Sequence, residues 1–477
     1  MVFPIAGGNQ DTSYEISNSL RFDRADSALL SRSPSSSGNR QILTISAWFK
    51  LGTLTNERVI IAADDGGAGN TGGNNNFDYI AVNGNRKLFL YNYESNEGYQ
   101  FISNQTITDP SAWYHIVAAF DTTQGTNTNR LKIYLNGNQI TSWATSNYPD
   151  QNRNLLYNHT GSTTIGRYPD QAASFFDGYM SDVNVVDGQQ LDPTYFGNFN
   201  PQGIWTPKEY TGSYGTNGFF LEFKQTGTSQ NSSGIGADTS GNDHHFAVTN
   251  LASTDVTIDT PTNNFATANP AVGRDLGNDI KNGNLTVPAD ASGDIITFST
   301  QSFKTGKWYM EAKSTVTNGH GNRKTLGVIS IDSEIDFPRI FSSSSPYDGV
   351  VVDLRVGDVY RNGSDTSVNI STFSNGDIVG LAYDADEGKL EIHKNGTYLL
   401  QDSDGVSALD LTKEYLFYLN QDGGGSNAGN LELNFGVPSK SFSISSGNAD
   451  GNGFGNFEYA PPSGYLALCT KNLAETG

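Results

Sequence analysis

Glu334 and Asp336 are the acidic residues whose spacing could support glycoside hydrolysis. Residues two apart on a β-strand share a face, which places their carboxyl groups near the roughly 5–5.5 Å separation of a retaining pair. Such an acidic strand normally carries a third acid close to position 339, where this chain has Arg339 after Pro338. A proline also indicates an edge strand or a loop. We therefore interpret the two acids as structural.

The histidines and the single cysteine form no catalytic or zinc-binding pattern. No HExxH spacing and no GxSxG motif occurs. His115 alternates with Trp113 and Val117, which predicts a core or half-buried histidine, and Cys469 in GYLALCTK is typical of a buried strand thiol. The remaining histidines are His159, His244, His245, His320 and His393. The sequence therefore predicts that the chain is not an enzyme.

Short alternating runs of apolar residues make up most of the chain and predict strands of about six residues. The clearest are Ile42–Leu51, Ala112–Asp121, Arg130–Gly137, Gly178–Gly188, Gly306–Ser314, Gly376–Gly396 and Asn430–Gly436. Asn136-Gly137 predicts a hairpin, because both residues tolerate the positive φ of a primed turn. A helical period is absent apart from a single turn near Pro193–Phe196. These patterns predict an all-β protein.

Length and composition limit the number of domains and the classes of partner. The chain has 477 residues, enough for two sandwiches, and its 23 tyrosines and 26 phenylalanines argue against disorder. A net charge of −21 disfavours binding to nucleic acid or to anionic membranes. One cysteine excludes an internal disulfide, and no apolar run approaches the ~20 residues of a membrane span. The first residues show no secretory signal.

Changes in pattern along the chain predict four regions. Residues 1–15 resemble an arm that docks on a neighbour, and residues 16–225 form a first antiparallel sandwich. Residues 226–280, rich in Ser, Asn, Gly and Thr, are expected to be a partly structured connector. Residues 281–477 form a second antiparallel sandwich.

The first half resembles the laminin-G/concanavalin A-like (LamG-like) domain, in the version found in tailed-phage virion proteins. The resemblance rests on SLRFDRADSALLSRSPSSSGNRQILTISAWFK, DPSAWYHIVAAFDTTQGTNTNRLKIYLNGNQIT, TIGRY, FFDGYMSDVNVVDGQQLDPTYFG and WTPKEYTGSYGTNGFFLEF, which follow one another in order over roughly residues 16–265. It implies a jelly-roll, concanavalin A-like sandwich.

The second half is similar to a SPRY domain. GKWYMEAKS matches an early strand of that family, Gly376–Gly396 a hairpin closed by Lys394-Asn395-Gly396, and NLELNFG a late strand. The ending FEYAPPSGYLALCTKNL resembles a recurring end of phage proteins. Together the resemblances imply a phage virion structural protein, such as a tail fibre, spike or head decoration, assembled in the host cytoplasm.

A LamG-like domain implies possible sites for calcium and for sugar. Calcium would bind through loop carboxylates, with Asp64, Asp65, Asp78, Asp177 and Asp182 as candidates. Asp384-Ala385-Asp386-Glu387-Gly388 has its glycine one place too early for an EF-hand and predicts a hairpin turn. For sugar stacking, Tyr91, Tyr93 and Tyr99 flank a polar loop, whereas Trp48, Trp113 and Trp308 are expected in cores.

The resulting hypothesis is a surface-exposed virion protein that docks through residues 1–15 and presents two sandwiches to host-surface glycans. Binding would consist of weak contacts multiplied by copy number, with a homotrimer as the expected assembly. Three alternatives remain open: a capsid- or tail-stabilising protein without a ligand, a glycan depolymerase on the same scaffold, and a secreted adhesin.

Overall fold

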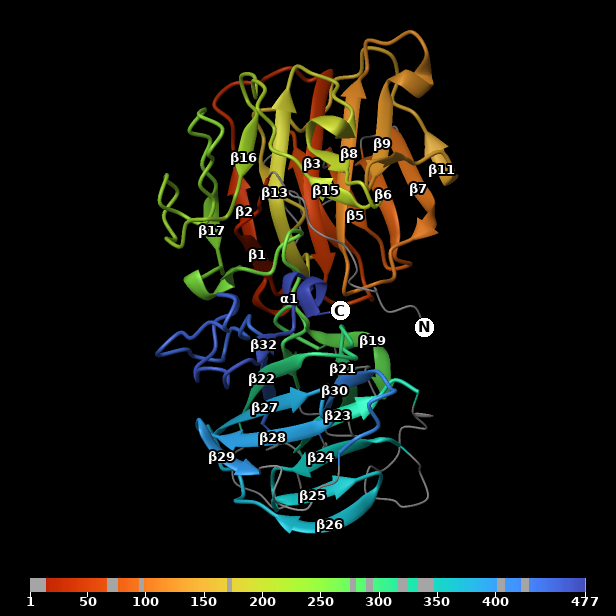
Figure 1. Ribbon diagram of the computed structural model, residues 1–477. Helices are drawn as coiled ribbons and strands as arrows, with labels where there is room; N and C mark the ends of the chain where they lie inside the picture. Colours follow the sequence, from red (N-terminus) through yellow and green to blue (C-terminus); the bar gives the residue numbers. More distant parts are fainter. Residues whose placement is uncertain are drawn as a thin grey trace. The chain divides into compact units, whose positions relative to one another are not determined.

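The computed structural model describes residues 14–66, 76–93, 98–169, 174–274, 280–288, 295–315, 324–332, 347–400, 408–421 and 429–476 (Figure 1). Two compact units divide between Thr262 and Asn263. Each consists of two main β-sheets, so the predicted all-β fold of two sandwiches is confirmed. Glu334, Asp336, His320 and residues 1–13 of the expected arm lie outside the described residues.

The first sheet of the first sandwich has long central strands and short edge strands. Its order is β10 (Asn138–Gln139), β9 (Leu131–Leu135), β8 (Trp113–Asp121), β3 (Ile42–Leu51), β13 (Gly178–Asp187), β1 (Ser19–Phe22) and β18 (Val256–Thr257), with β16 (Phe219–Leu221) also on β13. All these pairings are antiparallel. The predicted turn joins β9 to β10, with Asn136 at φ 47° and Gly137 at φ 76°.

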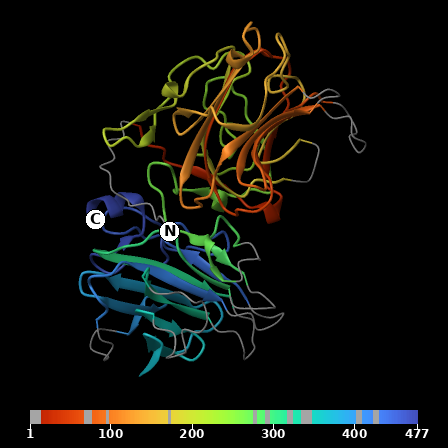
Figure 2. The same ribbon diagram turned by 90° about the vertical axis from the view of Figure 1, so that its right-hand side faces the viewer.

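The second sheet faces the first, and the two layers separate in the turned view of Figure 2. Its order is β11 (Trp143–Asn147), β7 (Tyr99–Thr106), β6 (Lys87–Tyr93), β5 (Phe77–Val82), β4 (Arg58–Asp64), β12 (Thr163–Ile165), β2 (Leu29–Arg32) and β17 (Ala247–Thr249). Every second side chain along these strands points into a core that the two sheets share. A separate ribbon pairs β14 (Gly197–Phe199) with β15 (Trp205–Pro207). Single 3-10 turns are η1 (Arg24–Asp26), η2 (Asn127–Asn129), η3 (Pro193–Tyr195), as expected, and η4 (Ser253–Asp255).

Residues 226–262, expected to belong to a connector, contribute strands to the first sandwich. Within them β17 pairs with β2, and β18 pairs with β1. A buried ion pair holds the segment, since Asp259 Oδ2 lies 2.8 Å from Lys50 Nζ and both side chains are 1% exposed. Trp113 Nε1 donates to the other oxygen of Asp259 at 3.3 Å. The segment is therefore held by charge neutralisation together with core contacts of apolar side chains such as Phe246.

The described end of the expected arm also packs on the first sandwich. Tyr14 packs against a cluster on the outer face of the first sheet that includes Trp48 and Trp113. Its hydroxyl donates to Asp182 Oδ2 at 2.9 Å. Tyr14 is thus part of the sandwich surface.

The second sandwich has two seven-stranded sheets. The first has the order β19 (Ala268–Arg274), β21 (Ile295–Ser299), β30 (Tyr415–Gln421), β23 (Lys324–Ser330), β24 (Gly349–Asp353), β25 (Asp358–Arg361) and β26 (Ser364–Asn369). The other has the order β20 (Thr286–Val287), β31 (Leu431–Asn434), β22 (Lys307–Ser314), β27 (Ile378–Asp384), β28 (Lys389–Lys394) and β29 (Thr397–Leu400), with β32 (Leu466–Ala467) on β22. The β32 pairing is parallel, unlike the others in this sheet.

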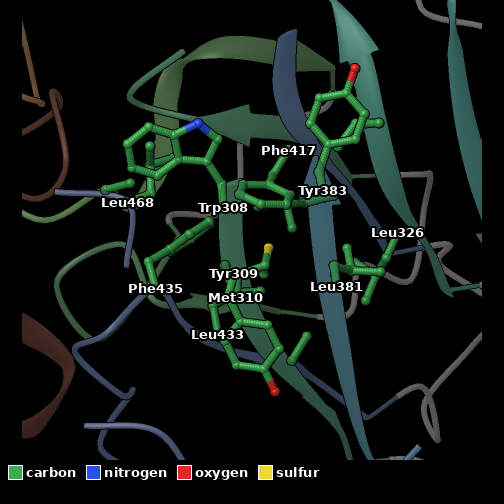
Figure 3. Packing of buried hydrophobic residues seen from close by; sticks show 14 of the residues in the cluster. Trp308, Tyr309, Met310, Leu326, Leu381, Tyr383, Phe417, Leu433, Phe435 and Leu468 are labelled. Carbon is green, nitrogen blue, oxygen red and sulfur yellow. The ribbon is translucent and has the colours of Figure 1, made fainter. Parts of the chain in front are cut away.

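Large side chains fill the core of the second sandwich (Figure 3). Trp308 and Met310 of β22 pack with Phe417 of β30 and Leu326 of β23, so the core joins both sheets. Trp308 lies in this core, as expected. Trp48 and Trp113 are buried as expected, at 4% and 9% exposed, but they belong to the cluster on the outer face of the first sheet. The turn at Asp384 is the expected hairpin between β27 and β28.

The last described segment packs on the second sandwich through buried carboxylates. Glu311 accepts the backbone N–H groups of Glu458 and Tyr459 at 2.9 and 2.8 Å, and burial raises its pKa to about 7. Asp450 accepts from Asn472 in α1 (Thr470–Thr476). The sequence did not predict this helix, which is too short to show a period. No helix in the described ranges is long and apolar enough to span a membrane.

Replacing Asp259 by Asn should destabilise the first sandwich by about 3–5 kcal/mol, because it removes the buried carboxylate that lies 2.8 Å from the Lys50 ammonium. Urea unfolding of the full chain can be followed by tryptophan fluorescence, since four of the five tryptophans lie in this sandwich (Trp48, Trp113, Trp143 and Trp205). Lys224→Gln is the control, because Lys224 is half exposed beside Glu222 and its loss should cost below about 1 kcal/mol. Equal, small losses in both variants would contradict the role of the buried pair.

Candidate functional site

The outer face of the second sheet in the first sandwich carries a group of aromatic side chains. Directly paired residues of neighbouring strands share a face. Phe77 of β5 pairs with Tyr93 of β6, and Tyr79 pairs with Tyr91. Phe89 lies on the same side of β6, two residues from Tyr91. With Tyr168, these residues form one cluster, here called the aromatic platform, in which Tyr79 and Tyr168 are buried and the other rings are half-buried or exposed.

The rings of the platform contact one another rather than standing singly. The Phe77 and Tyr93 rings are stacked, with centroids 5.3 Å apart, and the Phe89 and Tyr91 rings are stacked at 5.5 Å. Tyr79 meets Phe89 and Tyr91 edge-on, at 5.3 and 5.7 Å. Such contacts restrict ring motion, so the surface is organised before any ligand arrives.

Tyr168 borders the platform on the side of β4. Its ring packs edge-on against Tyr79 with centroids 4.8 Å apart, and its hydroxyl donates to Glu57. Ser174 donates to the same Glu57 oxygen at 3.2 Å. Burial and the nearby Glu57 carboxylate raise the pKa of Tyr168, so its phenol stays protonated. Tyr168 is therefore a fixed, buried neighbour of the more exposed rings.

Polar groups extend the platform in the opposite direction, toward the sheet edge. Gln100 of β7 pairs with Tyr91 on one side and with Asn147 of β11 on the other. Pairing places both amides on the outer face beside the rings. Gln100 is half-buried and Asn147 is exposed. The surface thus combines apolar ring faces with amide donors and acceptors, which is the composition of a site for a polyhydroxylated ligand.

Tyr99, expected beside Tyr91 and Tyr93, is not part of this surface. In the structure Tyr99 is 0% exposed, and its ring packs against Phe120 in the core. Its partner across β6 is Asn92, so it points to the opposite face from Tyr91. The prediction was wrong because Tyr99 pairs with the buried Asn92 and not with Tyr91 or Tyr93.

Asp64, Asp65 and Asp78, three candidates for calcium, are not gathered on one face. Asp78 pairs with Ala63 and points toward the core, where it accepts from Asn92 and from the Leu156 backbone N–H at 2.6 Å. Asp64 accepts the backbone N–H of Ser162 at 2.6 Å, and Asp65 accepts from the Asn76 amide at 2.8 Å. Residues 67–75, which follow Asp65, lie outside the described residues.

The other two candidates, Asp177 and Asp182, lie at β13. Asp177 accepts the N–H of Gly52 through its backbone carbonyl at 2.9 Å. Asp182 sits at an irregularity of β13 with φ 44°, and burial raises its pKa to about 7. Among the described residues no group of three or more acidic, histidine or cysteine side chains is placed to hold a metal. Calcium binding stays a prediction for all five residues.

A buried serine–histidine pair, Ser46 and His115, does not have the geometry of a nucleophile and its base. Ser46 Oγ lies 2.8 Å from His115 Nε2. Trp205 Nε1, which can only donate, lies 3.0 Å from His115 Nδ1, so Nδ1 must accept. Burial lowers the pKa of His115 to about 3, so the ring is neutral and Nε2 carries its proton. His115 therefore donates to Ser46 and cannot deprotonate it. The histidine is buried, at 1% exposed, but on the outer face of the first sheet, where its ring stacks on Trp48.

Sequence reasoning missed four members of the platform: Phe77, Tyr79, Phe89 and Tyr168. The first three follow from alternation in FDYIAV and KLFLYNY, because the polar or aliphatic residues between them face the other way. No local pattern marks Tyr168, which follows β12 and reaches the platform only through the fold.

The fold and the platform together define a two-sandwich β-protein with a preformed, aromatic surface on its first sandwich. Residues 23–192 match the family Laminin G 3, described as the concanavalin A-like lectin/glucanases superfamily. The matched segment runs from η1 past the end of β13 and contains every strand of the platform. The LamG-like resemblance of the first sandwich is therefore confirmed.

Similarity to individual proteins is short or remote. The chain is 33% identical over 102 residues to dual specificity protein kinase splA of Dictyostelium discoideum, a match that spans 21% of this chain and only 4% of the kinase. Similar solved structures include the SPRY domain of human HERC1, at 16% identity and TM-score 0.26, over 33% of this chain and 91% of that one.

Two further solved structures are similar to this chain. Domains LG4-5 of the mouse laminin alpha1 chain give 10% identity and TM-score 0.28, over 90% of both chains. A putative carbohydrate binding protein from Bacteroides ovatus gives 13% identity and TM-score 0.31, over 50% of this chain and 58% of that one. At such identities and TM-scores these likenesses concern the fold and say nothing about function.

The burial difference between Tyr99 and Tyr93 predicts a difference in stability. Tyr99→Ala should lower the unfolding free energy of the first sandwich by about 3–5 kcal/mol, as for other large core side chains. Tyr93 is 40% exposed, so Tyr93→Ala should cost below about 1.5 kcal/mol. Urea unfolding of the two full-length variants measures both values. Similar costs would place Tyr99 on the surface after all.

Proposed function

We propose that this chain is a non-catalytic structural protein of a phage particle that binds host-surface glycans through the aromatic platform. The platform is the observation that carries the proposal, because it offers preformed ring faces on an outer sheet surface. Aromatic faces stack on the apolar faces of sugar rings, while the amides of Gln100 and Asn147 are suited to sugar hydroxyls.

The ligand class has support from the family match as well as from the surface. Residues 23–192 belong to a superfamily whose description names lectins and glucanases. Of these two activities, binding fits the described residues better. The buried pair Ser46 and His115 is held in a tautomer that cannot act as a base on the serine, and the platform itself holds no pair of carboxylates.

The assignment to a virion rests on the LamG-like sequence segments quoted above, which follow one another in order, and on the C-terminal segment that resembles phage proteins. We further propose that the chain is a tail fibre, spike or head decoration and that residues 1–15 contribute to docking it on the particle. A homotrimer would multiply weak contacts of individual platforms into firm attachment.

Tyr91→Ala should weaken glycan binding about tenfold or more, because it removes a ring at the middle of the platform. The test is a binding titration of the full-length protein against surface polysaccharides of candidate hosts. Tyr195→Ala is the matched control, since Tyr195 is 47% exposed in the same sandwich but outside the platform. Equal binding by wild type and Tyr91→Ala, or release of reducing ends from the polysaccharide, would contradict the proposal.

The particle assignment predicts that purified phage particles contain this chain in many copies. A mass-spectrometric census of the particle, followed by labelling with antibodies against the first sandwich, measures both its presence and its exposure. A census that does not find the chain would refute the virion role and leave glycan binding to be judged by the titration.

A further inference from the structure

Lys87 lies at one end of the aromatic platform. It is the first residue of β6, whose alternate residues Phe89, Tyr91 and Tyr93 carry the rings. Two steps along a strand cover roughly 6–7 Å, which is within reach of a lysine side chain. Lys87 therefore shares the outer face with the rings, and its ammonium can meet a substituent of a sugar stacked on Phe89.

The Lys87 side chain has no partner in the part of the chain that the structure describes. No hydrogen bond, ion pair or ring contact involves its ammonium, although the residue is half-buried. Some lysines have acidic neighbours, such as Lys394 with Asp377 at 2.9 Å and Lys389 with Glu387 at 2.8 Å, whereas Lys132 on β9 resembles Lys87 in this respect.

An available cation is notable in a chain with 50 acidic and 29 basic residues. The carboxylate on this face that borders the platform, Glu57, already accepts from Tyr168 and Ser174. Thr106 of β7 pairs with Lys87, after a register shift between Lys87 and Phe89, and is exposed. This end of the platform is therefore polar and cationic, whereas its middle is apolar.

We infer that the glycan bound by the platform is acidic, with a carboxylate-bearing sugar held by Lys87 while neighbouring sugar rings stack on Phe89 and Tyr91. The inference rests on the proposed glycan binding and specifies its ligand class. A carboxylate within hydrogen-bond reach of a half-buried ammonium forms a charge-assisted contact, stronger than a neutral one. The net charge of the remaining chain acts over longer distances and is largely screened beyond the ~10 Å Debye length at 0.1 M salt.

The experiment compares acidic polysaccharides with their own carboxyl-reduced forms, in which each carboxylate has become an alcohol. Polygalacturonate, alginate and hyaluronan serve as probes for the full-length protein. Wild type should bind the acidic form about five- to tenfold more tightly, and Lys87→Gln should remove this preference while still binding the reduced form. Lys132→Gln is the control. Lys132 lies half-buried on β9 of the other sheet, so this substitution removes the same charge and should leave the preference for the acidic form unchanged.

The possible results separate this inference from the proposed function. A preference that survives in Lys87→Gln, or a wild-type preference for the reduced forms, would refute the role of Lys87 and leave glycan binding in place. Loss of affinity for both forms in Tyr91→Ala, with loss of the acid preference alone in Lys87→Gln, would support both. Absence of binding to every acidic and reduced probe would refute the inference, and the host polysaccharide titration would then decide the proposed function by itself.

Discussion

The pairing register of β4, β5, β6 and β7 determines both the core and the surface of the first sandwich. Along β5, Ile80 enters the core while Phe77 and Tyr79 face outward. Side chains alternate with a period of two, so a slip of one residue would exchange the two sets. The core and the platform therefore constrain the same register, and a sequence change that weakens one also disturbs the other.

The two outer faces of this sandwich are used differently. Over the first sheet, Trp205 covers His115, while Asp259 and the segment around it cover Lys50 and Trp113. Buried polar groups there are satisfied by partners distant in sequence, and the face is closed. On the second sheet, Tyr93 is exposed and Phe77, Phe89 and Tyr91 are half-buried. A surface able to receive a ligand thus remains on the second sheet.

The sequence predicted what local chemistry determines. Alternation gave the all-β class, and Asn136-Gly137 gave the hairpin between β9 and β10, because backbone preference at two residues suffices for such a turn. It failed where distant groups decide the structure. Asp259 attaches residues 226–262 to Lys50, more than 200 positions away, and no pattern within the Ser- and Thr-rich segment indicates that pairing.

The candidate site also combines residues that the local sequence predicts with residues that only distant contacts bring together. Tyr91 and Tyr93 could be predicted because they alternate on one strand, but the face of Tyr99 depends on the register in which β7 pairs with β6. Tyr168 joins the platform through contacts with Tyr79 and Glu57 that no sequence spacing expresses. Helix α1 is likewise held by Asp450 and Asn472 rather than by an apolar period.

An outer sheet face limits the affinity that one binding site can reach. A ligand lying on the platform is covered from below, so much of its surface stays in water. A ligand that is less buried gains less binding free energy for the same loss of translational and rotational freedom. Each bound ligand should therefore dissociate readily. Such a surface is useful when several copies act together, because a glycan that dissociates from one copy can bind to a neighbouring copy before it diffuses away. The open geometry of the platform therefore favours a protein displayed many times on one particle over an isolated receptor with a single tight site.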